Sequence, residues 1–168
     1  MRFIINFLER RADEATRRRT SAICYALALT LGFLGIPQPF GAGSLGPTLQ
    51  WMLSLGLGVP SLWAAFSHAV FAEHVAQSIG WAPSSFQKEV AGANLGIGLG
   101  AIAASVLGPE AAWAMTFMAA GFLWSAASTH IADMVRSKNF AINNAGPIFW
   151  WDILTPLTLL IGLLLLHR

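Results

Sequence analysis

The sequence predicts an all-α fold, a bundle of hydrophobic helices that crosses a lipid bilayer, and two observations carry this prediction. Of the 168 residues, 55% are hydrophobic and only 11% are charged, whereas soluble domains usually carry about 25% charged residues. Long apolar runs also alternate with short segments rich in Pro, Gly or polar residues. The charges are too few to cover a soluble surface, so we expect the apolar surplus to face lipid.

The first segment, residues 1–19, is predicted to be a basic amphipathic helix that lies in the membrane interface. Its apolar side chains recur at helical spacing, at Phe3, Ile4, Phe7 and Leu8. Six of the ten basic residues of the chain fall here: Arg2, Arg10, Arg11, Arg17, Arg18 and Arg19. Because the segment runs directly into an apolar stretch and no recognition fold follows, we expect the lipid bilayer, and no nucleic acid, as its partner. A cleaved signal peptide is the alternative, although no clear A-x-A site follows.

Residues 20–168 are predicted to form the transmembrane helical domain, with five spans at about 21–36, 49–71, 90–107, 111–131 and 147–166. The first apolar run is shorter than the roughly 20 residues that a full span needs. If it does not cross, four spans remain, and the N-terminus changes side or lies in the interface. Pro60 lies near the middle of the second run and should kink that helix, because proline removes a backbone donor.

The basic residues predict the orientation of these spans. Five spans put the two termini on opposite sides of the membrane. With the N-terminus inside, nine of the ten basic residues face the cytoplasm, namely the six early arginines, Lys88, Arg136 and Lys138, and only Arg168 faces out. This distribution obeys the positive-inside rule. We therefore expect a multi-pass protein of the bacterial cytoplasmic membrane with a cytoplasmic N-terminus.

Glycines recur at every fourth position of the third predicted span, at Gly92, Gly96 and Gly100. A stripe of small residues allows two helix backbones to approach closely in lipid. The pattern predicts that this stripe packs against a neighbouring helix.

Ten polar side chains lie at the predicted cytoplasmic ends of spans two to five, and ionisable groups at membrane depth usually face a bundle interior or a wet cavity. They predict a polar pocket in the inner half of the bilayer, with Asp152 closest to His130. The alternative is that they are solvated helix ends at headgroup depth. The ten residues are His68, Glu73, His74, Glu89, Asn94, His130, Asp133, Asn143, Asn144 and Asp152.

A metal site is a weaker interpretation of the same residues. His68 and His74 lie about 120° apart on a helix, so they do not share a face as the histidines of H-E-x-x-H do. Ligands would have to come from separate helices, and His68, His130 and Asp152 are the candidates. Cys24 is the only cysteine and offers no thiolate cluster. The sequence does not identify a cofactor.

Several motifs resemble a family of small bacterial integral membrane proteins of unknown function. They are AQSIGW (76–81), PSSFQKE (83–89), ANLG (93–96), HI (130–131) and NFAINNAGP (139–147). The resemblance covers about residues 50–165 and implies a helical membrane bundle, without adding an activity.

Three classes of function remain open on the sequence alone. The first is a binding or accessory protein for a lipid-like molecule or a membrane partner subunit, which the lack of a catalytic motif favours. The second is a membrane enzyme that acts on a lipophilic substrate or quinone, with or without a metal. The third is a small transporter, which would need polar residues through the outer half of the bilayer as well, where few are found.

Overall fold

The structure is a computed structural model that describes the backbone of residues 14–166 and the side chains from Arg19 onward. Residues 1–13 of the predicted interfacial helix over 1–19 thus lie outside the described residues, and residues 14–19 form the first part of α2, continuous with the apolar run that follows. Every regular element in the described part is helical: α2 (Glu14–Phe33), the 3₁₀ turn η1 (Gly43–Leu45), α3 (Gly46–Trp51), the π-helical η2 (Met52–Gly58), α4 (Val59–Val70), α5 (Ala72–Ile79), α6 (Phe86–Leu107), α7 (Pro109–Arg136), α8 (Ile142–Ala145) and α9 (Pro147–Leu166). The predicted all-α class is confirmed.

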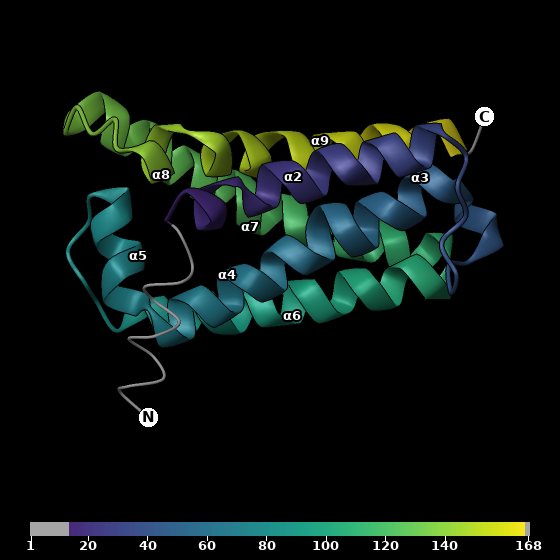
Figure 1. Cartoon of the computed structure of the whole chain (residues 1–168), viewed down its shortest axis with the longest axis horizontal. Helices are drawn as coiled ribbons and strands as arrows, with labels where there is room; N and C mark the ends of the chain where they lie inside the picture. The colour runs from purple at the N-terminus through teal and green to yellow at the C-terminus, as the bar shows by residue number, and fades with distance from the viewer. Residues whose placement is uncertain (1–13, 167–168) are drawn as a thin grey trace.

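The long helices lie side by side along the longest axis of the molecule (Figure 1). They are α2, the continuous α3–η2–α4 unit, α6, α7 and α9, and they alternate in direction. The short helices α5 and α8 lie together at one end, which we call the α5–α8 end. The opposite end holds the α2–α3 connection, the turn between α6 and α7 at Gly108, and the last turn of α9.

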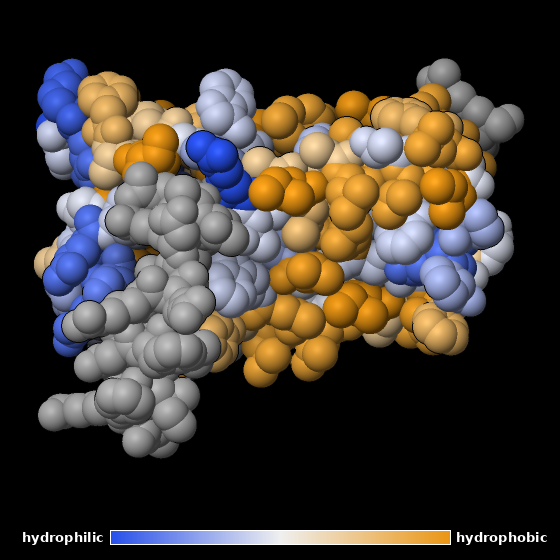
Figure 2. Space-filling view, viewed as in Figure 1, coloured by the Kyte–Doolittle hydropathy of each residue, from blue (hydrophilic) through white to orange (hydrophobic). Residues whose placement is uncertain are grey.

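Hydrophobic side chains dominate the middle of the visible surface, and polar residues gather toward its two ends (Figure 2). Three helical stretches are long and apolar enough to cross a membrane: Gly43–Val70 with 28 residues, Phe86–Leu107 with 22 and Ile142–Leu166 with 25. These correspond to the second, third and fifth predicted spans.

The helices at the first and fourth predicted spans are not among these three stretches. The apolar part of α2, Arg19–Phe33, is shorter than a full span. Helix α7 has 28 residues, enough length at 1.5 Å per residue, but small and weakly polar residues reduce its hydropathy. Some of the small residues, Ala112, Thr116 and Ala119, are fully buried against neighbouring helices, whereas Ser125, Ser128 and Thr129 are exposed.

Proline at position 60 is accommodated by a change of helix type rather than by a break. The chain is helical from Gly46 to Val70, and the π-helical segment η2 ends at Gly58, two residues before Pro60. In an α-helix the amide of residue 60 would donate to the carbonyl of Gly56, which Pro60 cannot do. The indole Nε1 of Trp151 donates to this carbonyl instead, at 2.9 Å. This bond ties α9 to the second helical unit.

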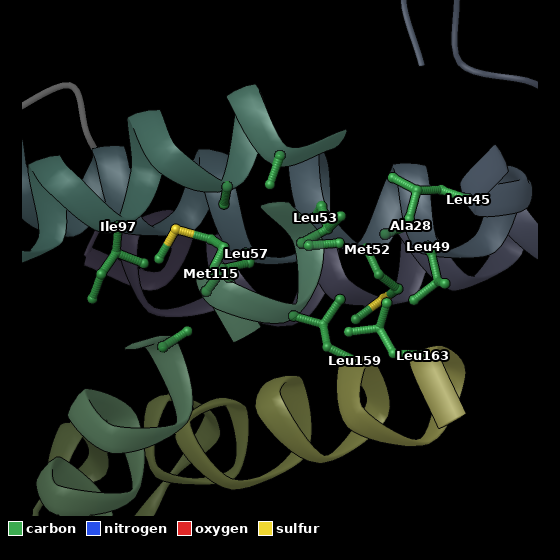
Figure 3. Close-up of a cluster of buried hydrophobic side chains, with 14 of the residues drawn as sticks. Ala28, Leu45, Leu49, Met52, Leu53, Leu57, Ile97, Met115, Leu159 and Leu163 are labelled. Atoms are coloured by element: carbon green, nitrogen blue, oxygen red, sulfur yellow. The ribbon is translucent and has the colours of Figure 1, made fainter. Parts of the chain in front are cut away.

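The apolar core fills the half of the bundle away from the α5–α8 end. Side chains of η1, α3 and η2 meet Leu159 and Leu163 of α9 and Met115 of α7 (Figure 3). Leu45, Met52, Leu53 and Leu57 are almost completely buried. In the half of the bundle near α5 and α8, polar and aromatic side chains take the place of this apolar core.

The predicted glycine stripe does not mediate packing within the described chain. Gly92 and Gly96 are exposed, and a Cβ added at either would meet nothing within 4 Å. The close contact lies on the adjacent face, where a Cβ on Gly58 would lie 3.3 Å from the carbonyl oxygen of Gly98. A four-residue repeat advances about 40° per step around a helix, so the stripe rotates along α6, and only Gly100 reaches a neighbour, Met115.

We predict opposite effects for two glycines of α6. A Cβ on Gly98 would lie 2.7 Å from Cδ2 and 3.0 Å from the backbone nitrogen of Leu62. Gly98→Ala should therefore overpack the α4–α6 contact and cost about 1–3 kcal/mol. Gly96→Ala is the matched control and should be neutral or stabilising by up to about 1 kcal/mol, since glycine is a poor helix former. Thermal unfolding of the detergent-purified protein measures both, and equal melting temperatures would contradict the assigned face.

Candidate functional site

A partly open cavity of about 770 Å³ lies between the helices at the α5–α8 end, within the size range of small-molecule sites. Helices α4, α5, α6, α7 and α9 all contribute to its wall. Much of the lining is aromatic and comes from Trp63, Phe71, Trp81, Phe86, Phe122 and Trp151. An apolar, aromatic wall with a few polar groups is typical of a site for a lipophilic molecule.

One wall of the cavity carries a histidine held by an amide. Nδ1 of His68 on α4 hydrogen-bonds Oε1 of Gln87 on α6. Since an amide oxygen only accepts, the Nδ1 of His68 carries the proton, and in the neutral ring Nε2 is left as an acceptor. Asn94 lies two helical turns after Gln87 on the same face of α6. Its side-chain amide donates to the carbonyl of Val90 at 3.0 Å.

The other wall carries a second histidine in the same kind of arrangement. Asn144 donates through Nδ2 to the carbonyl of Asn139 at 2.7 Å, so its Oδ1 faces Nδ1 of His130 at 2.6 Å. His130 must therefore donate from Nδ1, which leaves Nε2 as an acceptor in the neutral ring. This Nε2 lies 3.9 Å from Oδ2 of the buried Asp152. Trp81 stacks on the imidazole, with ring centroids 5.4 Å apart.

Two connections that are far apart in the sequence close this end of the bundle together. The side-chain amide of Asn139 donates to Oδ2 of Asp133 at 2.6 Å and to the carbonyl of Ile79 at 2.8 Å. The indole of Trp81 donates to the same carboxylate oxygen at 2.8 Å. Gly80 ends α5 with a φ of +88°, and a Cβ there would lie 2.7 Å from the Asn139 amide. These contacts hold Trp81 over His130.

Two polar atoms in the cavity wall have no partner among the described residues. They are Oγ of Ser67 and Oδ1 of Asn143. Each residue is only 9% exposed. Burying a polar atom without a hydrogen bond costs free energy, so two such residues in the wall of one cavity make it a candidate site for a ligand that supplies the missing hydrogen bonds.

Six of the ten polar residues singled out in the sequence line this cavity: His68, His74, Asn94, His130, Asn143 and Asp152. Asn144 is buried behind His130. Asp133 lines a smaller neighbouring cavity with Trp81 and Arg136.

Glu73 and Glu89 do not belong to the cavity, which corrects the sequence prediction for both. They are exposed, because each lies two residues, about 200° of helix rotation, from a residue that faces inward. Val75 and Gln87 are those inward residues. Gln87 was missed because it lies in a polar stretch that resembles a loop; its position in the first turn of an apolar helix is the signal that would have found it.

A metal site from His68, His130 and Asp152 is not assembled. No group of three histidine, cysteine, aspartate or glutamate side chains in the described part of the chain is arranged to hold a metal ion. Both histidines are instead hydrogen-bonded to amides.

The fold and cavity define a class: an all-helical bundle, with helices long and apolar enough to cross a membrane, and with a partly open cavity between its helices. The chain belongs to a family of unknown function, DUF6790, whose model matches residues 18–168. Comparison with curated proteins and with solved structures finds no match. The match begins well before residue 50, where the resemblance seen in the sequence starts.

The bonds to Asp133 make the stability of the α5–α8 end depend on pH. Donation from Trp81, then from Ser137 and Asn139, holds the pKa of Asp133 below its ordinary value of 3.8. A lowered folded-state pKa contributes stability above pH 3.8 that is lost as the pH falls through the folded-state value.

We therefore predict that Trp81→Phe lowers the melting temperature more at pH 7 than at pH 3, because it removes one of the hydrogen-bond donors to Asp133 but keeps an aromatic ring over His130. Trp124→Phe is the matched control, since the indole of Trp124 donates to a backbone carbonyl at 3.4 Å and not to a titrating group. Its effect should be the same at both pH values. Thermal unfolding in detergent measures the change in melting temperature of each variant, relative to the wild-type protein, at pH 7 and at pH 3. An equal loss for Trp81→Phe at both pH values would contradict the role of Trp81 as a donor to the Asp133 carboxylate.

Proposed function

We propose that this protein is a multi-pass protein of the bacterial cytoplasmic membrane that binds a lipophilic small molecule in the cavity at its α5–α8 end. The observation that carries the proposal is the cavity itself, about 770 Å³, aromatic over much of its wall and provided with buried polar atoms that lack partners. A protein that only needed stability would fill such a volume with apolar side chains, as the opposite half of this bundle does.

The charge distribution supports a cytoplasmic location for the α5–α8 end. Lys88, Arg136 and Lys138 lie there, in or beside the connections around α5 and α8. The long helices alternate in direction, and α2 starts at the same end. Five crossings with a cytoplasmic N-terminus would place nine of the ten basic residues inside, as the positive-inside rule favours. The less apolar α7 and the short α2 would then cross as packed members of the bundle.

We predict that reporter fusions place Arg168 outside and Lys138 inside. Alkaline phosphatase fused after Arg168 should be active, and green fluorescent protein at the same position should be dark. The same reporters fused after Lys138 are the matched control and should give the reverse pattern. An inactive phosphatase fusion at Arg168 would refute five crossings and favour four.

Binding is favoured over transport by the contents of the other half of the bundle. The cavity meets a core of fully buried apolar side chains such as Leu53, Leu57 and Leu159. A polar route through the monomer would have to pass this core.

A membrane enzyme acting on a lipophilic substrate is the second candidate, and one specific observation favours it. A histidine next to a buried carboxylate can take up and release a proton, and His130 lies 3.9 Å from Asp152 at the cavity wall. The two candidates differ in what happens to a bound molecule, because a binding protein returns it unchanged. Mass spectrometry of probes recovered after incubation distinguishes them.

We predict that filling the cavity abolishes binding. Ala126 lines the cavity, and Ala126→Phe should occupy part of its volume. The probes are twelve-carbon amphiphiles, namely 1-dodecanol, dodecylamine, dodecanoate and dodecyl methyl ether, each at a fixed ratio to detergent. At least one should raise the melting temperature of the wild-type protein, since a ligand stabilises the state that binds it.

Ala126→Phe should lose that shift. Gly96→Phe is the control, because position 96 opens onto free space, and it should keep the shift. No stabilisation of the wild-type protein by any of the four probes would refute the proposed function.

A further inference from the structure

We propose that the cavity selects a ligand whose head group donates hydrogen bonds, a hydroxyl or a primary amine, and rejects anionic head groups. This inference rests on the proposed binding function and specifies its ligand. It is carried by three polar groups of the cavity wall, at Asn143, at His130 beside Asp152, and at Ser67, each of which is left able to accept a hydrogen bond.

The first free acceptor is Oδ1 of Asn143. The hydroxyl of Ser78 donates to the carbonyl of Val75 at 2.8 Å, so it can only accept from Asn143. Nδ2 of Asn143 makes that bond at 2.9 Å, which determines the orientation of the amide. Oδ1 is thereby left buried and without a partner in the described part of the chain. An amide oxygen can only accept, so its missing partner must be an O–H or N–H group.

The second acceptor is Nε2 of His130, which lines the same cavity next to the carboxyl group of Asp152. Asn144 holds the Nδ1–H of His130, so the neutral ring presents a bare Nε2. The 3.9 Å from this atom to Oδ2 of Asp152 is too long for a direct hydrogen bond. It is short enough for one head-group atom to reach both.

The third polar contact is on the α4 side of the cavity. Oγ of Ser67 is buried, lacks a partner among the described residues, and lines the same cavity. A hydroxyl donates and accepts, so Ser67 can complete the bonding of a ligand hydroxyl or accept from an ammonium group.

The charges around the cavity argue against an anionic head group. No lysine or arginine is among the described residues that line it, although carboxylates and phosphates are usually bound by such side chains. The acidic residue that lines it, Asp152, is buried and supplies no positive charge. The rings of Trp63, Trp81 and Trp151 also line the cavity, and aromatic faces attract cations but not anions.

The test compares the probes named above, together with dodecyltrimethylammonium, which is cationic but has no N–H. The full-length protein in detergent is titrated with each probe, and the apparent affinity is obtained from the melting temperature. We expect 1-dodecanol, dodecylamine or both to bind about tenfold more tightly than dodecyl methyl ether, the difference that one hydrogen bond to a buried acceptor makes. Dodecanoate should bind most weakly.

Variants then assign the effect to the residues. Ser67→Ala should weaken binding of the donor probes without lowering the melting temperature of the free protein, because its hydroxyl has no partner to lose. Ser61→Ala is a matched control on the same helix, since Ser61 is also buried and unpartnered in the described chain but does not line the cavity. It should leave affinity unchanged. Asn143→Leu should reduce the preference for 1-dodecanol over its ether, and Ser67→Ala keeps the test valid if this second variant fails to fold.

The outcomes separate this inference from the proposed function. Equal affinity for all probes, or tightest binding of dodecanoate, overturns the head-group inference while the binding function stands. Equal binding of dodecylamine and dodecyltrimethylammonium also overturns it, because charge and not donation would then decide. Preference for the alcohol or for the primary amine supports the inference, and the stronger of the two identifies a neutral or a cationic head group. No stabilisation by any probe refutes the proposed function itself.

Discussion

The cost of burying a polar atom without a partner is the constraint on which this structure depends. A bundle surrounded by apolar surface offers few water molecules to its interior, so each inward polar group needs a partner from another helix. Trp151 on α9 satisfies a carbonyl that Pro60 cannot satisfy within its own helix. Tyr25 on α2 meets the hydroxyl of Thr158 on α9 at 2.5 Å. Such bonds join helices that apolar contacts alone would leave free to slide or rotate.

The same constraint organises the candidate site. At the α5–α8 end, amide side chains satisfy histidine rings, and loop residues satisfy the amides in turn. Asn139 is the centre of this arrangement, because its side chain bridges the end of α5 and the end of α7 while its carbonyl orients Asn144. The chain of bonds determines which nitrogen of His130 carries the proton, and so the chemical character of the cavity wall follows from residues that do not line it.

The two halves of the bundle differ in how closely their side chains pack. In the apolar half, leucines and methionines from three segments interdigitate (Figure 3), and helices approach closely where glycines face a neighbour, as Gly58 and Gly98 do. In the other half, large aromatic side chains stand around the cavity and hold its walls apart. The contrast between the halves is what makes the cavity a feature of the fold rather than a packing defect.

The amino-acid sequence by itself determined the helical class, the order of the long helices and the end of the molecule at which polar side chains gather. Composition and the length of each apolar run are local properties, and they need no knowledge of neighbours. The ionisable residues that line the cavity, including His68, His130 and Asp152, were recognisable because ionisable groups are rare in apolar runs. The nearness of His130 to Asp152 was also expected, and the structure places them 3.9 Å apart.

Only the tertiary structure decided which way each helix faces and which polar groups meet. Gly92 and Gly96 form a regular pattern, but the buried face of α6 is set by the side chains that α4 and α7 present to it, and these glycines lie outside that face. Glu73 and Gln87 look equally polar in the sequence, yet one is exposed and the other holds His68. A rotation of about 100° per residue separates inside from outside on a helix, and the contacts between helices, which no single segment encodes, determine that rotation.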